Sequence, residues 1–319
     1  MKTILLAAAA LLALPNAAVA ADTLRWPSPW EAGLSLVYET ESLDSEAKAG
    51  QREKIRTTDT TEVTISQASA DGYLQEWRSR DLGFEVIEGD KAAGALREAA
   101  VRAMADSTVE VALDKNGNYA SIRNLDALST RMREVMRPLI VASIEAEVGK
   151  LDEGKRDKAR AEALKGSDGI LDRITSPAML EPMLGRVLQT YNGFVGVDLE
   201  IGEWYELETA QANPLGGKPF PSKLQFQLYP SEDDPNDVFL EWNSSVDPDK
   251  GADAMWELTE KLVGKKIPPK ERKALPDTVA IKDEGFFLFR RDTGIVEMYE
   301  SVRTIKLGDH EKVERQRMR

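Results

Sequence analysis

Five stretches of the chain alternate apolar and polar residues with a period of two. They lie at residues 34–39, 109–113, 195–201, 224–228 and 238–242. Because successive side chains of a strand point to opposite faces, this pattern buries the apolar set and leaves the polar set in water. Strands with one wet face are typical of antiparallel sheets, since parallel sheets are usually covered on both faces. The chain is therefore expected to fold around an antiparallel sheet.

Short turn sequences separate several of these strands. Asp71–Gly72, Asn116–Gly117 and Asp292–Gly294 each lie between two strand-like segments, and Gly308–Asp309 precedes a last polar segment. Such sequences accept the positive φ angles of tight hairpin turns. The sequence therefore predicts three to five hairpins.

Helical signals interrupt the strands in the middle of the chain. An apolar stripe with spacings of three and four follows Asn124, which fits an N-cap, and Pro138 is expected to kink that helix. The charged, Ala-rich segment 152–165 predicts a solvated helix or a mobile excursion. Pro177 fits the start of a second apolar helix. Two shorter helices are predicted at residues 92–104 and 252–263.

Together these elements predict an α+β fold. A mostly antiparallel, curved sheet, either a half-barrel or sandwich-like, would carry a helical insertion of residues 124–192 on one face. No repeat and no linker divides the chain, so residues 21–319 are expected to form one domain; two β domains joined by a helical segment are the alternative. The chain has no cysteine, so its stability must come from a packed core without disulfides.

The first 20 residues have the layout of a secretory signal peptide. Lys2 precedes an apolar run from Ile4 to Leu14, and Ala18–Ala20 supplies the small-residue cleavage pattern. A membrane anchor is the alternative, but a spanning helix needs roughly 20 apolar residues, which is longer than this run. We expect a periplasmic or secreted product that starts near Ala21 and has no integral membrane segment after cleavage. Lacking cysteine, it is not expected to be a lipoprotein.

The charge of the chain restricts its partners. The formal net charge is −13, and loss of Lys2 with the signal peptide makes it more negative. This charge repels nucleic acid and anionic membrane surfaces, so no nucleic-acid partner is expected. With one histidine and no cysteine, most transition-metal sites are excluded, because structural zinc needs about four nitrogen or sulfur ligands. No cofactor or metal is expected.

Four local segments carry a resemblance to known families. They are the first strand at 33–38, the hairpin at 111–117 that leads into 122–128, the phrase 199–205 after the helices, and the turn at 291–297. In these segments the chain resembles uncharacterised families of exported bacterial β-rich proteins. The resemblance brings no activity, cofactor or catalytic residue with it. The expected curved sheet with helices on its concave side is also similar in fold to the lipoprotein-carrier half-barrels of the periplasm.

Candidate catalytic and metal sites are weak. His310 lies in a polar turn, and no Gly-x-Ser-x-Gly motif supplies a nucleophile for it, so a surface histidine is the favoured interpretation. Segment 247–253 has the alternating acids of a calcium loop, but Gly251 and Leu258 do not fit the EF-hand pattern, which favours a helix cap. With 55 acidic residues, paired carboxylates occur everywhere and decide nothing.

Two apolar features are the candidate ligand-binding elements. The indoles of Trp26 and Trp30 would either stack on a ligand at a cavity mouth or close one edge of the sheet. The stripe on the second apolar helix would either fill the concave face of the sheet or leave a gap for an apolar guest. That stripe consists of Leu180, Met183, Leu184, Val187, Leu188 and Tyr191.

Three functions follow as hypotheses. The first is a non-catalytic envelope protein that binds a lipid-like or other apolar small molecule between sheet and helices. The second is a structural or protein–protein interaction module of the envelope without a ligand cavity, which predicts an exposed apolar patch. The third is a glycan hydrolase, which predicts a cleft with two facing carboxylates.

Overall fold

The computed structural model describes most of the chain from residue 23 onward. The described ranges are 23–48, 50–105, 107–211, 219–247, 279–307 and 310–319, with the positions 254, 256, 257, 260 and 266–268. The predicted signal peptide at 1–20, most of the helix predicted at 252–263 and the turn at 308–309 lie outside these residues. None of the described helices combines the length and apolar character needed to cross a bilayer.

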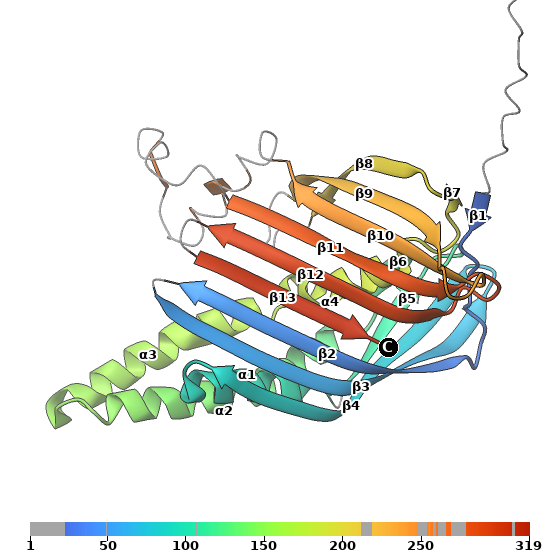
Figure 1. Cartoon of the computed structure of the whole chain (residues 1–319). Helices are drawn as coiled ribbons and strands as arrows, with labels where there is room; N and C mark the ends of the chain where they lie inside the picture. Colours follow the sequence, from blue (N-terminus) through green and yellow to red (C-terminus); the bar gives the residue numbers. More distant parts are fainter. Residues whose placement is uncertain are drawn as a thin grey trace, which may run out of the picture.

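Within the described ranges, eleven strands form one antiparallel sheet in the order β6-β5-β4-β3-β2-β13-β12-β11-β10-β9-β8 (Figure 1). The pairing of β2 with β13 brings strands far apart in the sequence together in mid-sheet. A second, two-stranded sheet pairs β1 with β7. The strands are β1 Thr23–Arg25, β2 Ser35–Lys48, β3 Gln51–Ser69, β4 Gly72–Glu88, β5 Thr108–Leu113, β6 Tyr119–Ile122, β7 Asp198–Glu200, β8 Trp204–Gln211, β9 Phe220–Pro230, β10 Asp237–Val246, β11 Val279–Arg290, β12 Val296–Leu307 and β13 His310–Met318.

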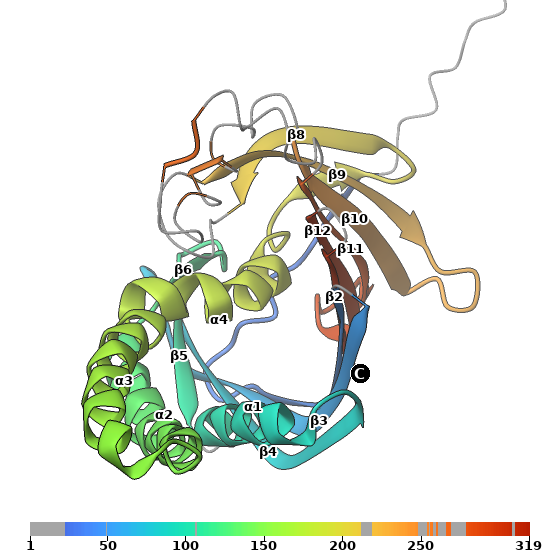
Figure 2. The ribbon, with the colours of Figure 1, turned by 90° about the vertical axis from the view of Figure 1, so that its left-hand side faces the viewer.

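Four helices accompany the sheet. They are α1 Lys91–Ala105, α2 Leu125–Val148, α3 Glu153–Ile174 and α4 Pro177–Asn192. Helix α4 lies inside the curve of the sheet (Figure 2), whereas α2 and α3 form a helical hairpin that projects beyond it (Figure 1). The predicted fold, a curved antiparallel sheet with a helical insertion on one face, is confirmed.

Most local predictions hold as well. The turns at 71–72, 116–117 and 292–294 join β3 to β4, β5 to β6 and β11 to β12. The helices begin after Asn124 and at Pro177 as expected. The side chain of Asn124 does not cap α2, however. Its Oδ1 accepts from the Glu110 N–H and its Nδ2 donates to the Thr108 carbonyl, which ties the helix start to β5.

The strand predicted at 195–201 is confirmed only in its second half. Only Asp198–Glu200 is a strand, and a turn precedes it. Gly196 adopts φ +78° there, and its N–H donates to the Trp26 carbonyl oxygen. Val195, in the turn, is buried in the main core. The first half of the period-two pattern thus belongs to a turn that packs on the core, and the second half to β7.

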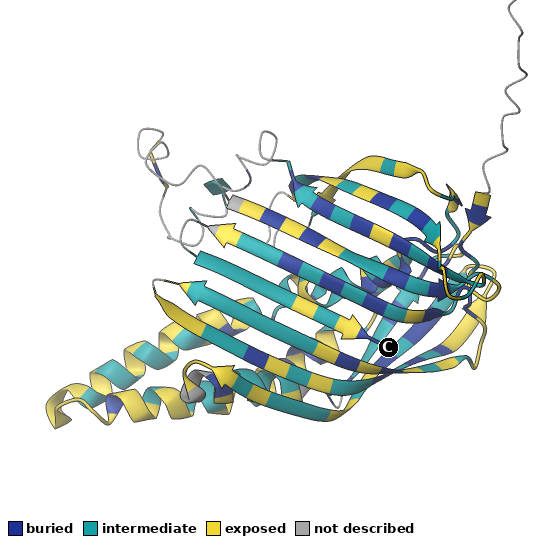
Figure 3. Cartoon of the chain, viewed as in Figure 1, coloured by how far each residue is buried: buried dark blue, intermediate teal, exposed yellow. Residues whose placement is uncertain are grey.

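The core occupies the concave side of the sheet. Buried residues alternate with more exposed ones along the strands (Figure 3), as the period-two pattern predicts. One inward row runs from Leu240 through Phe287 and Tyr299 to Met318 on four neighbouring strands. This row belongs to the main hydrophobic core, which also contains residues of α4 and of the segment before β2 and whose burial stabilises the fold.

Gly294 provides a test of this packing at one end of the core. It adopts φ +74°, and a Cβ there would overlap the Pro27 carbonyl oxygen. Gly294→Ala is therefore expected to lower the free energy of unfolding by about 2–3 kcal/mol, from left-handed backbone strain plus displacement of the Pro27 segment. Gly202→Ala is the matched control, because Gly202 has φ +88° and open space around it. Equal losses in urea denaturation would contradict the role of Pro27.

Candidate functional site

The predicted apolar stripe of α4 divides into two parts. Leu180, Leu188 and Tyr191 are buried in the core, and the Tyr191 hydroxyl hydrogen-bonds the Tyr38 hydroxyl at 2.8 Å. Met183 is 55% exposed. The remaining two members, Leu184 and Val187, are partly buried and pack against the same core. One face of α4 therefore closes the core, as predicted, while Met183 lies outside it.

Trp26 and Trp30 are both core residues. The Trp26 ring stacks on Phe289 with centroids 3.9 Å apart, and its Nε1 donates to the Gly294 carbonyl oxygen at 3.0 Å. Trp30 is buried beside Tyr191, with ring centroids 6.1 Å apart. Neither indole lines the cavity described next. Their place in the core favours the closing role considered from the sequence over a stacking platform for a ligand.

A cavity of about 740 Å³ lies between α4 and the concave face of the sheet. One wall comes from α4 and the residues after it, and the other from strands β8 to β13. Apolar side chains form part of the lining, namely Met183, Phe194, Leu224, Trp242 and Ile305. The gap between helix and sheet that the sequence left open as one alternative is therefore present, next to the filled core.

The sheet side of the cavity carries one row of polar side chains. The strand registers pair Ser244 with Asp283, Asp283 with Arg303, Arg303 with Glu314, and Glu314 with Asp44. We call these five residues the polar row. The first four line the cavity. They occupy inward positions on neighbouring strands, next to apolar residues of the same face such as Trp242 and Ile305.

Ion pairs connect α4 to the polar row. From α4, Arg186 places Nη2 3.0 Å from Glu314 Oε2 and Nη1 3.7 Å from Asp283 Oδ1. On the sheet, Arg303 Nη1 lies 3.6 Å from Asp283 Oδ2, and Lys312 Nζ lies 2.6 Å from Glu314 Oε1. Three cations and two carboxylates thus share one partly enclosed space.

The two carboxylates respond differently to this environment. Burial raises the pKa of Asp283 above its ordinary value, although the charges of Arg303 and Arg186 act in the opposite direction. Burial also acts to raise the pKa of Glu314, but Lys312 and both arginines outweigh it, so the pKa of Glu314 is lowered. Asp283 is therefore the carboxyl group of the cavity that takes up a proton more readily than an ordinary aspartate.

Three buried polar atoms of the cavity lining have no hydrogen-bond partner within the described part of the chain. They are Trp242 Nε1, Gln211 Oε1 and Asp283 Oδ1. All three belong to residues around Ser244: Gln211 Nε2 donates to Ser244 Oγ at 3.0 Å, Asp283 is the register partner of Ser244, and Trp242 lies two residues away on the same face. Leaving such an atom unpaired costs about 1–3 kcal/mol, so the cavity favours a polar guest atom at this place.

Sequence reasoning missed the polar row. On β10 and β11 the row appears as a single polar exception to an apolar series, namely Ser244 after Leu240 and Trp242, and Asp283 before Phe287. On β12, β13 and β2 further polar residues, such as Ser301, Gln316 and Ser42, share the inward face, so the row does not stand out there. A polar residue in an inward position of a strand is a usable signal. The row itself appears only when the registers of five strands are known, and those pairings join residues up to 270 positions apart.

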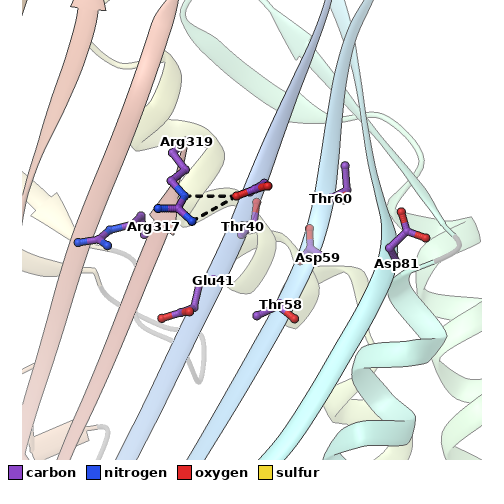
Figure 4. A pocket seen from close by; sticks show the side chains of 9 residues that line it. Thr40, Glu41, Thr58, Asp59, Thr60, Asp81, Arg317 and Arg319 are labelled. Atoms are coloured by element: carbon purple, nitrogen blue, oxygen red, sulfur yellow. Dashed lines mark hydrogen bonds and ion pairs between the residues drawn. The ribbon is translucent and has the colours of Figure 1, made fainter.

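A second hollow, of about 470 Å³, lies over β2, β3, β4 and β13 (Figure 4). Its cations are already paired: Arg319 with Glu39 at 3.3 Å, and Arg317 with Glu300 at 2.7 Å. Glu39 and Arg319 are exposed, so this is an open surface groove. It presents less evidence of a ligand than the cavity beside α4.

The weaker sequence candidates are placed as follows. The lone histidine, His310, begins β13 and lies partly buried with its Nε2 2.9 Å from Glu46 Oε1. It is not part of the cavity lining. Of the calcium-loop candidate at 247–253, only Asp247 belongs to the described residues. Among the described side chains, no group of three histidine, cysteine or acidic residues is arranged to hold a metal ion.

Comparison with known proteins gives little further information. No family model matches the chain, and no curated protein matches it. A solved structure of lipovitellin, described by its lipid–protein interactions, is similar at 8% sequence identity and a TM-score of 0.45. The match covers 91% of this chain and 25% of the lipovitellin chain, so this protein spans about a quarter of that length. A similarity at this level assigns neither a family nor a function.

Proposed function

We propose that this protein is an exported, non-catalytic binding protein that holds an amphiphilic small molecule between α4 and the sheet. One observation carries the proposal: a cavity of about 740 Å³ combines apolar walls with buried polar atoms that have no hydrogen-bond partner among the described residues. Ligand sites in proteins are typically about 300–1,000 Å³, mostly apolar, with a few polar groups that orient the ligand.

The apolar walls account for the affinity. Met183 and Phe194 on the helix side oppose Leu224, Trp242 and Ile305 on the sheet side. An alkyl chain inserted between them gains about 0.8 kcal/mol for each buried CH₂ group. Because Met183 is exposed, its apolar side chain would contact the alkyl chain of the ligand where that chain enters the cavity.

Filling the cavity is expected to weaken binding. Ser244→Phe places a ring among the unpaired polar atoms, and overpacking of about 1–3 kcal/mol corresponds to roughly 5- to 150-fold weaker binding of a 12-carbon alkyl probe. Ser245→Phe is the matched control, because the neighbouring residue points to the other face of the sheet and does not line the cavity. Isothermal titration calorimetry with dodecanoate measures both. Equal affinities of both variants and the wild type would place the binding elsewhere.

Export is the second part of the proposal. The support is the order of Lys2, the apolar run 4–14 and the Ala18–Ala20 cleavage pattern. Cell fractionation followed by N-terminal sequencing tests it directly. A mature product that begins at Ala21 in the periplasm or medium supports export, whereas an uncleaved cytosolic chain contradicts it.

Glycan hydrolysis is the competing proposal, because the cavity contains two carboxylates. Asp283 with its raised pKa and Glu314 with its lowered pKa differ in the way that a general acid and its partner differ. Both carboxylates, however, lie beside Arg186, and Lys312 further engages Glu314. Binding therefore fits the site better. Glycan turnover by the wild type that is lost in Asp283→Asn would favour the enzyme instead.

A further inference from the structure

We infer that the ligand of this cavity carries an oxyanion head group, a carboxylate or a phosphate, which Arg303 and Arg186 bind beside Trp242. This inference rests on the proposed function and specifies the chemical class of the ligand. The alkyl part of the molecule would lie among the apolar walls. The head group would lie on the polar row.

Arg303 supplies the main evidence. Its side chain is only 10% exposed, and within the described part of the chain its guanidinium makes a single ion pair, to Asp283 at 3.6 Å. A charged hydrogen bond of this kind normally measures about 2.7–2.9 Å, so this pair is loose. The planar guanidinium has five N–H donors, and a buried arginine with unused donors is poised to accept a bidentate oxyanion.

Two further donors belong to residues that line the same cavity. Arg186 Nη1 is also loosely paired, at 3.7 Å from Asp283 Oδ1, while its Nη2 is held by Glu314 at 3.0 Å. Trp242 Nε1 is a buried donor without a described partner. Arg303, Arg186 and Trp242 thus each offer the lining an N–H donor that is loosely paired or has no described partner, and an acceptor-rich guest such as a carboxylate or a phosphate would satisfy them.

The charges of the lining agree with an anionic guest. Among the residues that line the cavity, Arg186, Arg303 and Lys312 face the carboxylates of Asp283 and Glu314, an excess of one positive charge. Asp44, the fifth member of the polar row, lies outside the lining and is paired with Arg97 at 2.8 Å. The chain as a whole is strongly negative, so this local excess is opposite to the overall charge. Because a buried charge is costly unless it is paired, one oxyanion completes the balance.

Asp283 would otherwise repel an anion. Burial raises the pKa of this carboxyl, so it takes up a proton more readily than an ordinary aspartate. In the protonated form its Oδ1, which lacks a donor in the structure, becomes a possible hydrogen-bond donor to the head group. Gln211 has the same flexibility, because its amide presents either an oxygen or an NH₂ group to the cavity.

The test compares ligands of one chain length with different head groups. Dodecanoate, dodecyl phosphate and dodecanol are titrated into the purified mature protein by calorimetry at low salt. At least one anion is expected to bind about tenfold or more tightly than the alcohol, and the better anion identifies the head group. Equal affinity for all three would overturn the inference while leaving the proposed cavity function intact. Binding of none of them would overturn the proposed function itself.

A paired variant locates the head group. The double variant Asp283→Asn/Arg303→Gln removes one negative and one positive charge together. The net charge of the lining is therefore unchanged, and neither member of the ion pair is left charged without the other. The preference for the anion over dodecanol is expected to fall at least fivefold, with dodecanol affinity retained. Thermal unfolding confirms that the variant is folded. The control, Arg319→Gln with Glu39→Gln, removes an exposed ion pair of the outer groove and is expected to keep the full preference. An unchanged preference in the Asp283/Arg303 variant would overturn the assignment.

Discussion

Trp26→Ala is expected to lower the free energy of unfolding by about 3–5 kcal/mol, the usual cost of truncating a buried tryptophan. Trp26 is 2% exposed, stacks on Phe289, meets the edge of Phe287 and donates its indole N–H to the Gly294 carbonyl. Its removal opens a void where the segment before β2 closes the end of the core. The unpaired Gly294 carbonyl adds to the loss.

Urea denaturation followed by circular dichroism measures this effect. Trp204→Ala is the control, since Trp204 is 53% exposed at the edge strand β8 and is expected to cost about 1 kcal/mol or less. The affinity of folded Trp26→Ala for the alkyl probe is expected to be close to that of the wild type, because Trp26 does not line the cavity. A variant that stays as stable as the wild type but loses affinity would return Trp26 to the binding site.

Arg303→Met is expected to cost about 3 kcal/mol at neutral pH, because it leaves the buried Asp283 carboxylate with one fewer cation. The cost should depend on pH. Burial already raises the pKa of Asp283 in the folded protein, and removal of Arg303, whose charge lowers that pKa, raises it further. A folded-state pKa above the unfolded value of about 3.9 means that the folded state holds the proton more tightly.

Tighter binding of this proton stabilises the folded state relative to the unfolded state. This stabilisation is fully present below pH about 4 and is lost as the pH rises through the folded pKa of Asp283. The difference between wild type and Arg303→Met is therefore smallest near pH 4 and grows towards pH 8. Adding Asp283→Asn to Arg303→Met is expected to recover at least half of the loss at pH 8, since no carboxylate is then left uncompensated. If the stability difference between wild type and Arg303→Met did not change with pH, Asp283 would not be the group that loses its charge partner in the variant.

The fold was predictable wherever the signal lies within one element. The alternation around Leu36, Val111, Leu224 and Leu240 predicts four strands of the observed sheet, and Pro177 predicts the start of α4. Strand order was not predictable, because the pairing of β2 with β13 depends on residues about 270 positions apart. The turn at Gly196 resembled a strand in sequence, because Val195 and Val197 continue the alternation of β7.

The candidate site was predictable only in part. The apolar stripe of α4 correctly indicates a helix that packs on the sheet, and Met183 belongs to both the predicted set and the cavity lining. The sequence could not separate the filled part from the open part, because that division depends on what lies opposite each helix residue. Leu180 and Tyr191 face apolar core residues, whereas Arg186 faces the carboxylates of Asp283 and Glu314.

The central claim is that the space between α4 and the sheet holds an amphiphile, and native mass spectrometry tests it most directly. The mature protein is isolated from the envelope fraction of its own cells without detergent, and its mass is compared with that of the denatured, solvent-extracted chain. The account predicts a discrete excess mass that disappears on extraction and is absent from Ser244→Phe but present in Ser245→Phe. A wild-type mass equal to that of the bare polypeptide, together with no binding of the 12-carbon probes, would contradict it.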